Sequence, residues 1–237
     1  HTRLRTVTGV QTCALPIFSG AKVVVSSRKA PVCEEAAAEI RKAGGHATVI
    51  PCNISDKAQC EKLIGETQKQ VGPVDILVCN AASNPYYGPN EKLPDEVFLK
   101  IMQNNILSNM WLINLCLPDM RKKKDGSIQI VSSIGGLRAS TVIGAYCISK
   151  AADMQMARNL ANEYGPDNIR VNTIAPGLVT TDFARALYED LKAKRPALGG
   201  VRYGVFGLGD RTYAETFNFG GKHFDELLGE LGVAAGL

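Results

Sequence analysis

Short apolar segments alternate with helical segments along most of this chain, and this alternation restricts its fold more than any other feature. Five segments are rich in β-branched or other apolar residues and are predicted to be buried parallel strands; they cover residues 21–27, 46–54, 74–82, 126–134 and 169–177. Four segments between them predict helices over residues 31–45, 56–72, 93–124 and 145–165. Pro118 is the expected position of a break in the third helix. The pattern predicts an α/β fold with a doubly wound parallel sheet in a three-layer sandwich.

Polar or small residues follow each predicted strand at its carboxyl end. In a doubly wound sheet these ends meet at one edge, where ligands bind. A purely structural sheet has no need of polar groups at the same end of every strand. The candidate binding residues, in chain order, are Ser27, Arg28, Lys29, Asn53, Asn80, Ala81, Pro176, Gly177, Val179 and Thr181.

The last predicted helix carries a tyrosine and a lysine four residues apart, Tyr146 and Lys150. One helical turn separates them, so both side chains project from the same face. A free phenol has a pKa of about 10, and a nearby ammonium favours the phenolate and lowers that value. A tyrosine of this kind can exchange its proton with a carbonyl or alcohol oxygen. Ser133, at the end of the preceding strand, can donate a hydrogen bond to the same oxygen.

Four motifs together resemble the short-chain dehydrogenase/reductase family over about residues 19–187. The segment 132–152 (SSIGGLRASTVIGAYCISKAA) resembles its catalytic segment, and 75–82 (DILVCNAA) its N-N-A-G strand end, with Cys79 and Ala82 as departures. The segments 101–109 (IMQNNILSN) and 169–183 (IRVNTIAPGLVTTDF) match the asparagine helix and the nicotinamide loop. The resemblance implies a Rossmann-like fold and an oxidoreductase that transfers hydride between NAD(P)H and a carbonyl or alcohol.

The resemblance also implies roles for single residues. Ser133 would polarise the carbonyl, Tyr146 would be the acid and base, and Lys150 would bind the nicotinamide ribose and tune the tyrosine. Asn105 would anchor a proton-relay water, while Val179 and Thr181 would contact the carboxamide region. Simpler alternatives stay open: Asn105 as a helix-surface amide, Asn80 as a turn cap, and two adjacent loop tyrosines as packing or substrate contacts. These tyrosines are Tyr86 and Tyr87.

Arg28 predicts the choice of cofactor. No acidic residue follows the first strand to bind an unmodified ribose 2′-hydroxyl, and Arg28 can accommodate a 2′-phosphate instead. We therefore expect NADP rather than NAD, with a solvated basic turn as the alternative. The segments VVVSSRK and NAASNPYYG also resemble the NADP-dependent carbonyl reductase branch.

The N-terminal segment departs from the family. A glycine-rich phosphate loop should precede residue 20, but only Gly9 precedes Gly20, and Pro16 occupies the place of the helix interior. Residues 1–17 resemble the conceptual translation of a sequencing-library adapter. They imply a non-native segment before a core at residues 18–187, with the first strand and the glycine-rich loop lost or replaced.

The C-terminal segment departs too. Residues 188–235, within a predicted third part at 188–237, resemble the flavin-contacting loop of flavodoxins. The phosphate loop of flavodoxins is absent, so we expect no bound FMN. An FMN-binding electron-transfer module is still kept as an alternative function. A non-functional chimeric assembly product is a second alternative.

Composition restricts the remaining classes. The net charge is +4, and the dense basic cluster 121–124 is interpreted as a helix C-terminus rather than a nucleic-acid site. No apolar run has the length of a membrane span. Seven scattered cysteines without metal spacing predict reduced thiols, no metal and a cytoplasmic protein. We expect a small-molecule substrate and a homo-oligomer formed through the helices at 94–117 and 145–164.

Overall fold

The computed structural model describes residues 20–177, 202–203 and 234–235, and the chain divides into two compact units between Pro176 and Gly177. In the second unit only one pair of short parallel strands is described, β6 (Arg202–Tyr203) with β7 (Ala234–Ala235). The predicted boundaries at residues 17 and 187 and the N-terminal resemblance fall outside the described residues, and so does the C-terminal resemblance apart from β6 and β7.

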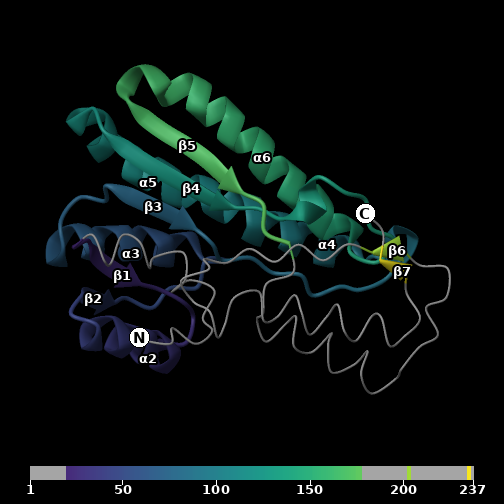
Figure 1. Ribbon diagram of the computed structural model, residues 1–237, viewed down its shortest axis with the longest axis horizontal. Helices are drawn as coiled ribbons and strands as arrows, with labels where there is room; N and C mark the ends of the chain where they lie inside the picture. The colour runs from purple at the N-terminus through teal and green to yellow at the C-terminus, as the bar shows by residue number, and fades with distance from the viewer. Residues whose placement is uncertain (1–19, 178–201, 204–233, 236–237) are drawn as a thin grey trace. The chain divides into compact units, whose positions relative to one another are not determined.

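The first unit contains all five predicted strands, and every pairing among them is parallel as predicted. They are β1 (Lys22–Val25), β2 (His46–Val49), β3 (Ile76–Cys79), β4 (Gly126–Val131) and β5 (Ile169–Ile174). β1 pairs with β2, while β4 lies between β3 and β5. Figure 1 shows β3, β4 and β5 side by side, with α6 running along β5.

Within the described residues the sheet therefore consists of two pieces, β1–β2 and β3–β4–β5. In the usual order of a doubly wound sheet, 3-2-1-4-5-6, the first strand lies between the second and the fourth. β1 and β3 correspond to these two flanking strands, so the division falls where the first strand of such a sheet belongs. The predicted loss of this strand concerns residues before Gly20, which lie outside the described part.

The helices follow the predicted pattern. They are α2 (Ala30–Lys42), α3 (Lys57–Gln70), α4 (Asp95–Met102), α5 (Ser108–Lys123) and α6 (Gly144–Tyr164). Three single turns, η1 (Asn90–Lys92), η3 (Ile134–Gly136) and η4 (Gly165–Asp167), complete the first unit together with η2, described below.

Helix ends agree with the chemistry of their sequences. Asp56 caps α3, since its carboxylate accepts from the backbone N–H of Ala58 at 2.9 Å. α5 ends at Lys124, which adopts the left-handed conformation with φ 56°. The basic cluster is thus a helix C-terminus, as predicted. Arg121 and Lys124 both pair with Asp167.

The expected break at Pro118 is wrong. Pro118 lies inside α5, where its ring removes the hydrogen bond to the carbonyl of Asn114. Both residues are exposed, so water can reach the carbonyl that has lost its partner. The interruption of the long helical segment comes earlier, at a π-helical turn, η2 (Gln103–Leu107). Such turns insert one residue into a helix and are frequent at functional sites.

One apolar cluster joins the elements of the first unit. Ile50, Leu63, Leu77, Ile113 and Ile128 are among its buried members, so side chains from α3, β3, α5 and β4 and from the segment after β2 pack together. Burial alternates along β4, where Ile128 and Ile130 are fully buried. Successive side chains of β4 therefore point to opposite faces of the sheet, and the more deeply buried set packs into the apolar cluster.

Candidate active site

Ser133 and Tyr146 lie together, as the sequence predicts. Ser133 follows β4 directly, and its Oγ accepts from the N–H of Gly135 at 3.0 Å, which begins η3. The Ser133 and Tyr146 side chains are close neighbours: a Cβ built on Gly135 would lie 3.4 Å from Oγ of Ser133 and 3.8 Å from Cε1 of Tyr146, and Ser133 lowers the pKa of the phenol. Pro176, after β5, accepts from the N–H of Ile134 at 3.0 Å, so the ends of β4 and β5 are joined at this point.

Close backbone packing holds this arrangement. A Cβ built on Gly136 would lie 2.8 Å from the backbone carbon and oxygen of Lys150. Only glycine allows η3 to approach α6 this closely. The Oγ of Ser132 donates to the same Lys150 carbonyl at 2.6 Å. The end of β4 and the second turn of α6 are therefore fixed against each other on either side of Ser133.

Lys150 is buried behind Tyr146 with only 2% of its surface exposed. Its Nζ lies 5.7 Å from the centroid of the Tyr146 ring. The ammonium donates to the carbonyl of Val131 at 2.8 Å and to Oδ2 of Asp153 at 3.0 Å. Two of its three N–H groups are thus committed to Val131 and Asp153, and no acceptor for the third lies among the described residues.

The predicted lowering of the tyrosine pKa is wrong. The pKa of Tyr146 is raised, chiefly because the phenol is buried; the nearby Ser133 side chain lowers it and the charge of Asp153 raises it further. Lys150 does not offset this rise, since it is paired with Asp153 and a paired ammonium presents little net charge to its surroundings.

Asp153 was not found from the sequence, although its position three residues after Lys150 on one helix face is a usable signal. It is fully buried, and Asn109 donates to its Oδ1 at 3.1 Å. Burial raises the pKa of the Asp153 carboxyl, while Lys150 and Asn109 act in the opposite direction.

Asn105 is fully buried, so the alternative of a helix-surface amide is wrong. Its side chain accepts from the N–H of Ser83 at 2.8 Å and donates to the Ser83 carbonyl at 3.0 Å and to Oγ of Ser149 at 2.9 Å. The neighbouring Asn104 bridges Ser83 to Ser55. The π-helical turn therefore joins the loops after β2 and β3 to α6.

The predicted binding residues of the first two strands lie at strand ends. Arg28 and Lys29 are exposed after β1, and within the described part neither side chain forms an ion pair. Ser27 shares a contact of 3.1 Å with the thiol of Cys33. Asn53 shapes the turn after β2, where its Oδ1 accepts from Ser55 N–H at 3.2 Å.

After β3, Ala81 is exposed, and the side chain of Asn80 makes no hydrogen bond to any described residue. The turn-capping alternative for Asn80 therefore finds no support there. Of the two loop tyrosines, Tyr86 donates to the carbonyl of Pro89 at 2.9 Å, whereas Tyr87 is 56% exposed.

The last predicted binding residues lie at or beyond residue 177, where the continuous described part of the chain ends. Gly177 is exposed and begins the second unit, while Val179 and Thr181 are outside the described residues. In the described ranges no cluster of three His, Cys, Asp or Glu side chains could hold a metal ion. The same ranges contain no helix that is both long and apolar enough to cross a membrane.

The first unit is an α/β unit of the Rossmann-like class, with Ser133, Tyr146 and Lys150 gathered near the carboxyl end of β4. The chain belongs to the short-chain dehydrogenase family, whose model matches residues 8–192. This match extends past both ends of the range 19–187 given by the motifs. Dehydrogenase/reductase SDR family member 4 of Bos taurus is 40% identical over 171 residues, which cover 72% of this chain and 61% of that protein.

Solved structures agree on the fold. A 7α-hydroxysteroid dehydrogenase in complex with NADH and 7-oxo glycochenodeoxycholic acid is 32% identical, with a TM-score of 0.70 over 76% of this chain and 70% of that one. A hydroxysteroid dehydrogenase from Escherichia coli is also 32% identical, with a TM-score of 0.70 over 77% and 75%. The predicted Rossmann-like α/β fold is confirmed. The alternative of an FMN-binding module is not favoured, since the family match covers most of the chain.

Proposed function

We propose that this chain is an oxidoreductase that transfers hydride between a nicotinamide cofactor and a small carbonyl or alcohol substrate. The contact between Ser133 and Tyr146, with Lys150 buried behind the ring, is the observation that carries this proposal. A hydroxyl and a phenol that lie side by side can both approach one substrate oxygen.

The described residues fit a dinucleotide. The cations Arg28 and Lys29 have no ion-pair partner in the described part, and an arginine fork suits a ribose 2′-phosphate. Asn80 offers an amide without a described partner, and Lys150 keeps one N–H for a ribose hydroxyl. We infer NADP rather than NAD from Arg28. NADPH would supply the hydride.

Each residue of the site has a task in this scheme. Ser133 donates a hydrogen bond to the substrate oxygen and stabilises the charge that develops on it. Tyr146 gives its proton to that oxygen during reduction and takes one from the alcohol during oxidation. Lys150 lies behind the phenol and would bind a ribose hydroxyl of the cofactor. Asn105 holds the loop after β3 against α6 through Ser83; its part in a water relay remains a prediction.

The test is turnover measured from nicotinamide absorbance. NADPH is mixed with a panel of carbonyl compounds that includes an aromatic aldehyde, an α-diketone and a 7-oxo bile acid. We expect reduction of at least one by the wild-type chain and a loss of about 10²–10⁴-fold in Tyr146→Phe, because the proton donor is removed. Equal rates in the two proteins, or a wild type that binds NADPH and reduces nothing, would refute the proposal.

Cofactor affinity is a separate question. The sequence has no glycine-rich loop before Gly20 to bind the pyrophosphate, so we propose weak binding. A fluorescence titration with NADPH measures it, and micromolar affinity would contradict this proposal.

We also propose a homo-oligomer and a reducing compartment. Leu99 on α4, Leu107 at the end of η2 and Ile148 on α6 are exposed apolar side chains on the helical segments expected to meet a second copy. The six described cysteines are all buried and free, which favours the cytoplasm. Light scattering after size exclusion tests the oligomer, and a monomer at micromolar concentration would contradict it.

A further inference from the structure

The scheme above leaves one buried ionisable group without a task, the carboxylate of Asp153. It lies one helical turn beyond Lys150 and is fully buried. Oδ2 is 3.0 Å from Nζ of Lys150, and Oδ1 accepts from Asn109 at 3.1 Å. Both oxygens therefore have partners.

The position itself does not require an acid. The neighbours of Asp153 on α6, Met154 and Ala157, are apolar and buried, and an apolar residue would continue the core. A buried ion pair adds little net stability compared with apolar packing, because both charges lose their hydration. The carboxylate is better explained by its effect on Lys150 than by stability.

Asp153 binds the ammonium. Together with the Val131 carbonyl, it takes two of the three donors of Lys150 and holds Nζ close to the end of β4. In this position Nζ lies 5.7 Å from the centroid of the Tyr146 ring. With Asp153 at 3.0 Å, the two charges nearly cancel at the phenol.

Other titratable groups near the pair are neutral at neutral pH. Their pKa values are all raised chiefly by burial; they are Tyr87 in the loop before η1, Cys147 on α6, Cys79 on β3 and Cys116 on α5. Charged side chains also occur on the elements packed against α6. These are Asp95, Glu96, Lys100, Arg138, Asp167 and Arg170.

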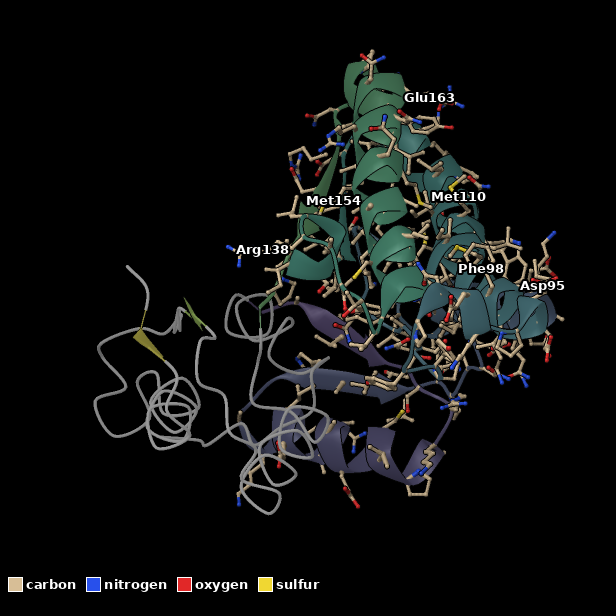
Figure 2. All side chains as sticks on the ribbon, turned by 90° about the vertical axis from the view of Figure 1, so that its right-hand side faces the viewer. Asp95, Phe98, Met110, Arg138, Met154 and Glu163 are labelled. Atoms are coloured by element: carbon tan, nitrogen blue, oxygen red, sulfur yellow. The ribbon has the colours of Figure 1, made fainter. Side chains whose placement is uncertain are left out.

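These charged side chains do not offset the pair. All of them are exposed except Asp167, which is held by Arg121 and Lys124. Figure 2 shows Arg138 and Asp95 at opposite outer edges of this region. Among the described residues, Lys150 and Asp153 are therefore the charges that decide the electrostatics at Tyr146.

Building on the proposed function, we propose that Asp153 is a positioning residue that holds Lys150 against the end of β4, cancels its charge and so keeps Tyr146 a neutral proton donor. The consequence is a site suited to carbonyl reduction over a wide pH range. The neutral phenol gives its proton in reduction, whereas oxidation requires the phenolate.

The test follows the ionisation of Tyr146 directly. The full-length chain is labelled with ¹³C at the tyrosine ζ carbon, the Tyr146 signal is assigned with Tyr146→Phe, and its midpoint is followed by NMR. We expect Asp153→Asn to lower the midpoint by about one pH unit, because the ammonium is no longer neutralised. Asp153→Glu should keep the wild-type midpoint. The alkaline limb of the kcat/KM profile for carbonyl reduction should move to lower pH in Asp153→Asn alone.

Controls separate this role from a structural one. Asp75→Asn removes the carboxylate of an exposed ion pair with Lys123, far from the ring, and should leave the midpoint unchanged. A lower melting temperature in Asp153→Asn with an unchanged midpoint would overturn the proposal. If Asp153→Asn does not fold, the wild type still tests the proposal: a Tyr146 midpoint below the ordinary tyrosine value would show that the ammonium is not neutralised and would overturn it.

The NMR titration requires no cofactor and no turnover. If the wild type reduces no carbonyl but Asp153→Asn shows the shift of the midpoint, the proposed function is refuted and the proposed role of Asp153 is supported. If the wild type reduces carbonyls and Asp153→Asn shows no shift, the proposed function is supported and the role of Asp153 is refuted.

Discussion

The side-chain amide of Asn105 donates to Oγ of Ser149 at 2.9 Å and so joins the π-helical turn to α6 one residue before Lys150. The same side chain pairs with both backbone groups of Ser83. One buried amide therefore links three segments that are distant in sequence. They are the π-helical turn, the loop after β3 and α6, which carries Tyr146 and Lys150.

Replacing Asn105 by alanine should destabilise the chain. The N–H and C=O of Ser83 would lose their partner, Oγ of Ser149 would keep only the Tyr146 carbonyl, and each buried unpaired group costs about 1–3 kcal/mol. We expect the free energy of unfolding in urea to fall by at least about 2 kcal/mol. Asn159→Ala is the matched control, since Asn159 is exposed on α6 and its side chain pairs with Gln155; its effect should stay within about 0.5 kcal/mol. Similar values for both variants would contradict the argument.

The sequence predicted the strands and the meeting of Ser133 with Tyr146, because both depend on local pattern and on the rule that strand ends share one edge. It did not predict the burial of Asn105. The π-helical turn inserts a residue and rotates the helix face, which a 3.6-residue period does not show. Asp153 was missed for a different reason. A charged residue on a helix is usually solvated, and only the packing of α6 against β4 and β5 shows that this one is buried.

Gly136→Ala should disturb the site through the backbone. The added methyl group would lie 2.8 Å from the Lys150 carbonyl, and neither η3 nor α6 can move without shifting Ser133 or Lys150. We expect a loss of about 1–3 kcal/mol in unfolding free energy, together with reduced turnover. Gly65→Ala in α3 is the control, because nothing lies within 4 Å of its added methyl group and alanine favours the helix by about 0.5–1 kcal/mol. If Gly136→Ala changed neither the unfolding free energy nor the turnover, η3 and α6 would not be held rigidly against each other.

Arg28→Ala should change the choice of cofactor. If Arg28 contacts a 2′-phosphate, its removal raises the Kd for NADPH about tenfold and leaves the Kd for NADH within about twofold. Both are measured by fluorescence titration at low salt, where the charge contact is least screened. Lys22→Ala at the opposite end of β1 removes the same charge and should alter neither the Kd for NADPH nor the Kd for NADH. An equal effect of Arg28→Ala on both cofactors would favour the solvated basic turn.

The cap of α3 predicts a dependence of stability on pH. The pKa of Asp56 is lowered, mainly by the hydrogen bond from the Gln59 side chain and also by backbone N–H groups at the start of the helix. Because the folded-state pKa lies below the unfolded value of about 3.9, the contribution is fully present above that value and is lost as the pH falls through the folded pKa. Asp56→Ala should therefore lower the urea midpoint clearly at pH of about 7, and the difference from wild type should shrink below pH of about 4. Glu61→Ala removes an exposed carboxylate from the same helix and should give a small difference that does not change in this window. A difference for Asp56→Ala that stays constant down to pH of about 3 would show that the cap does not act through its charge.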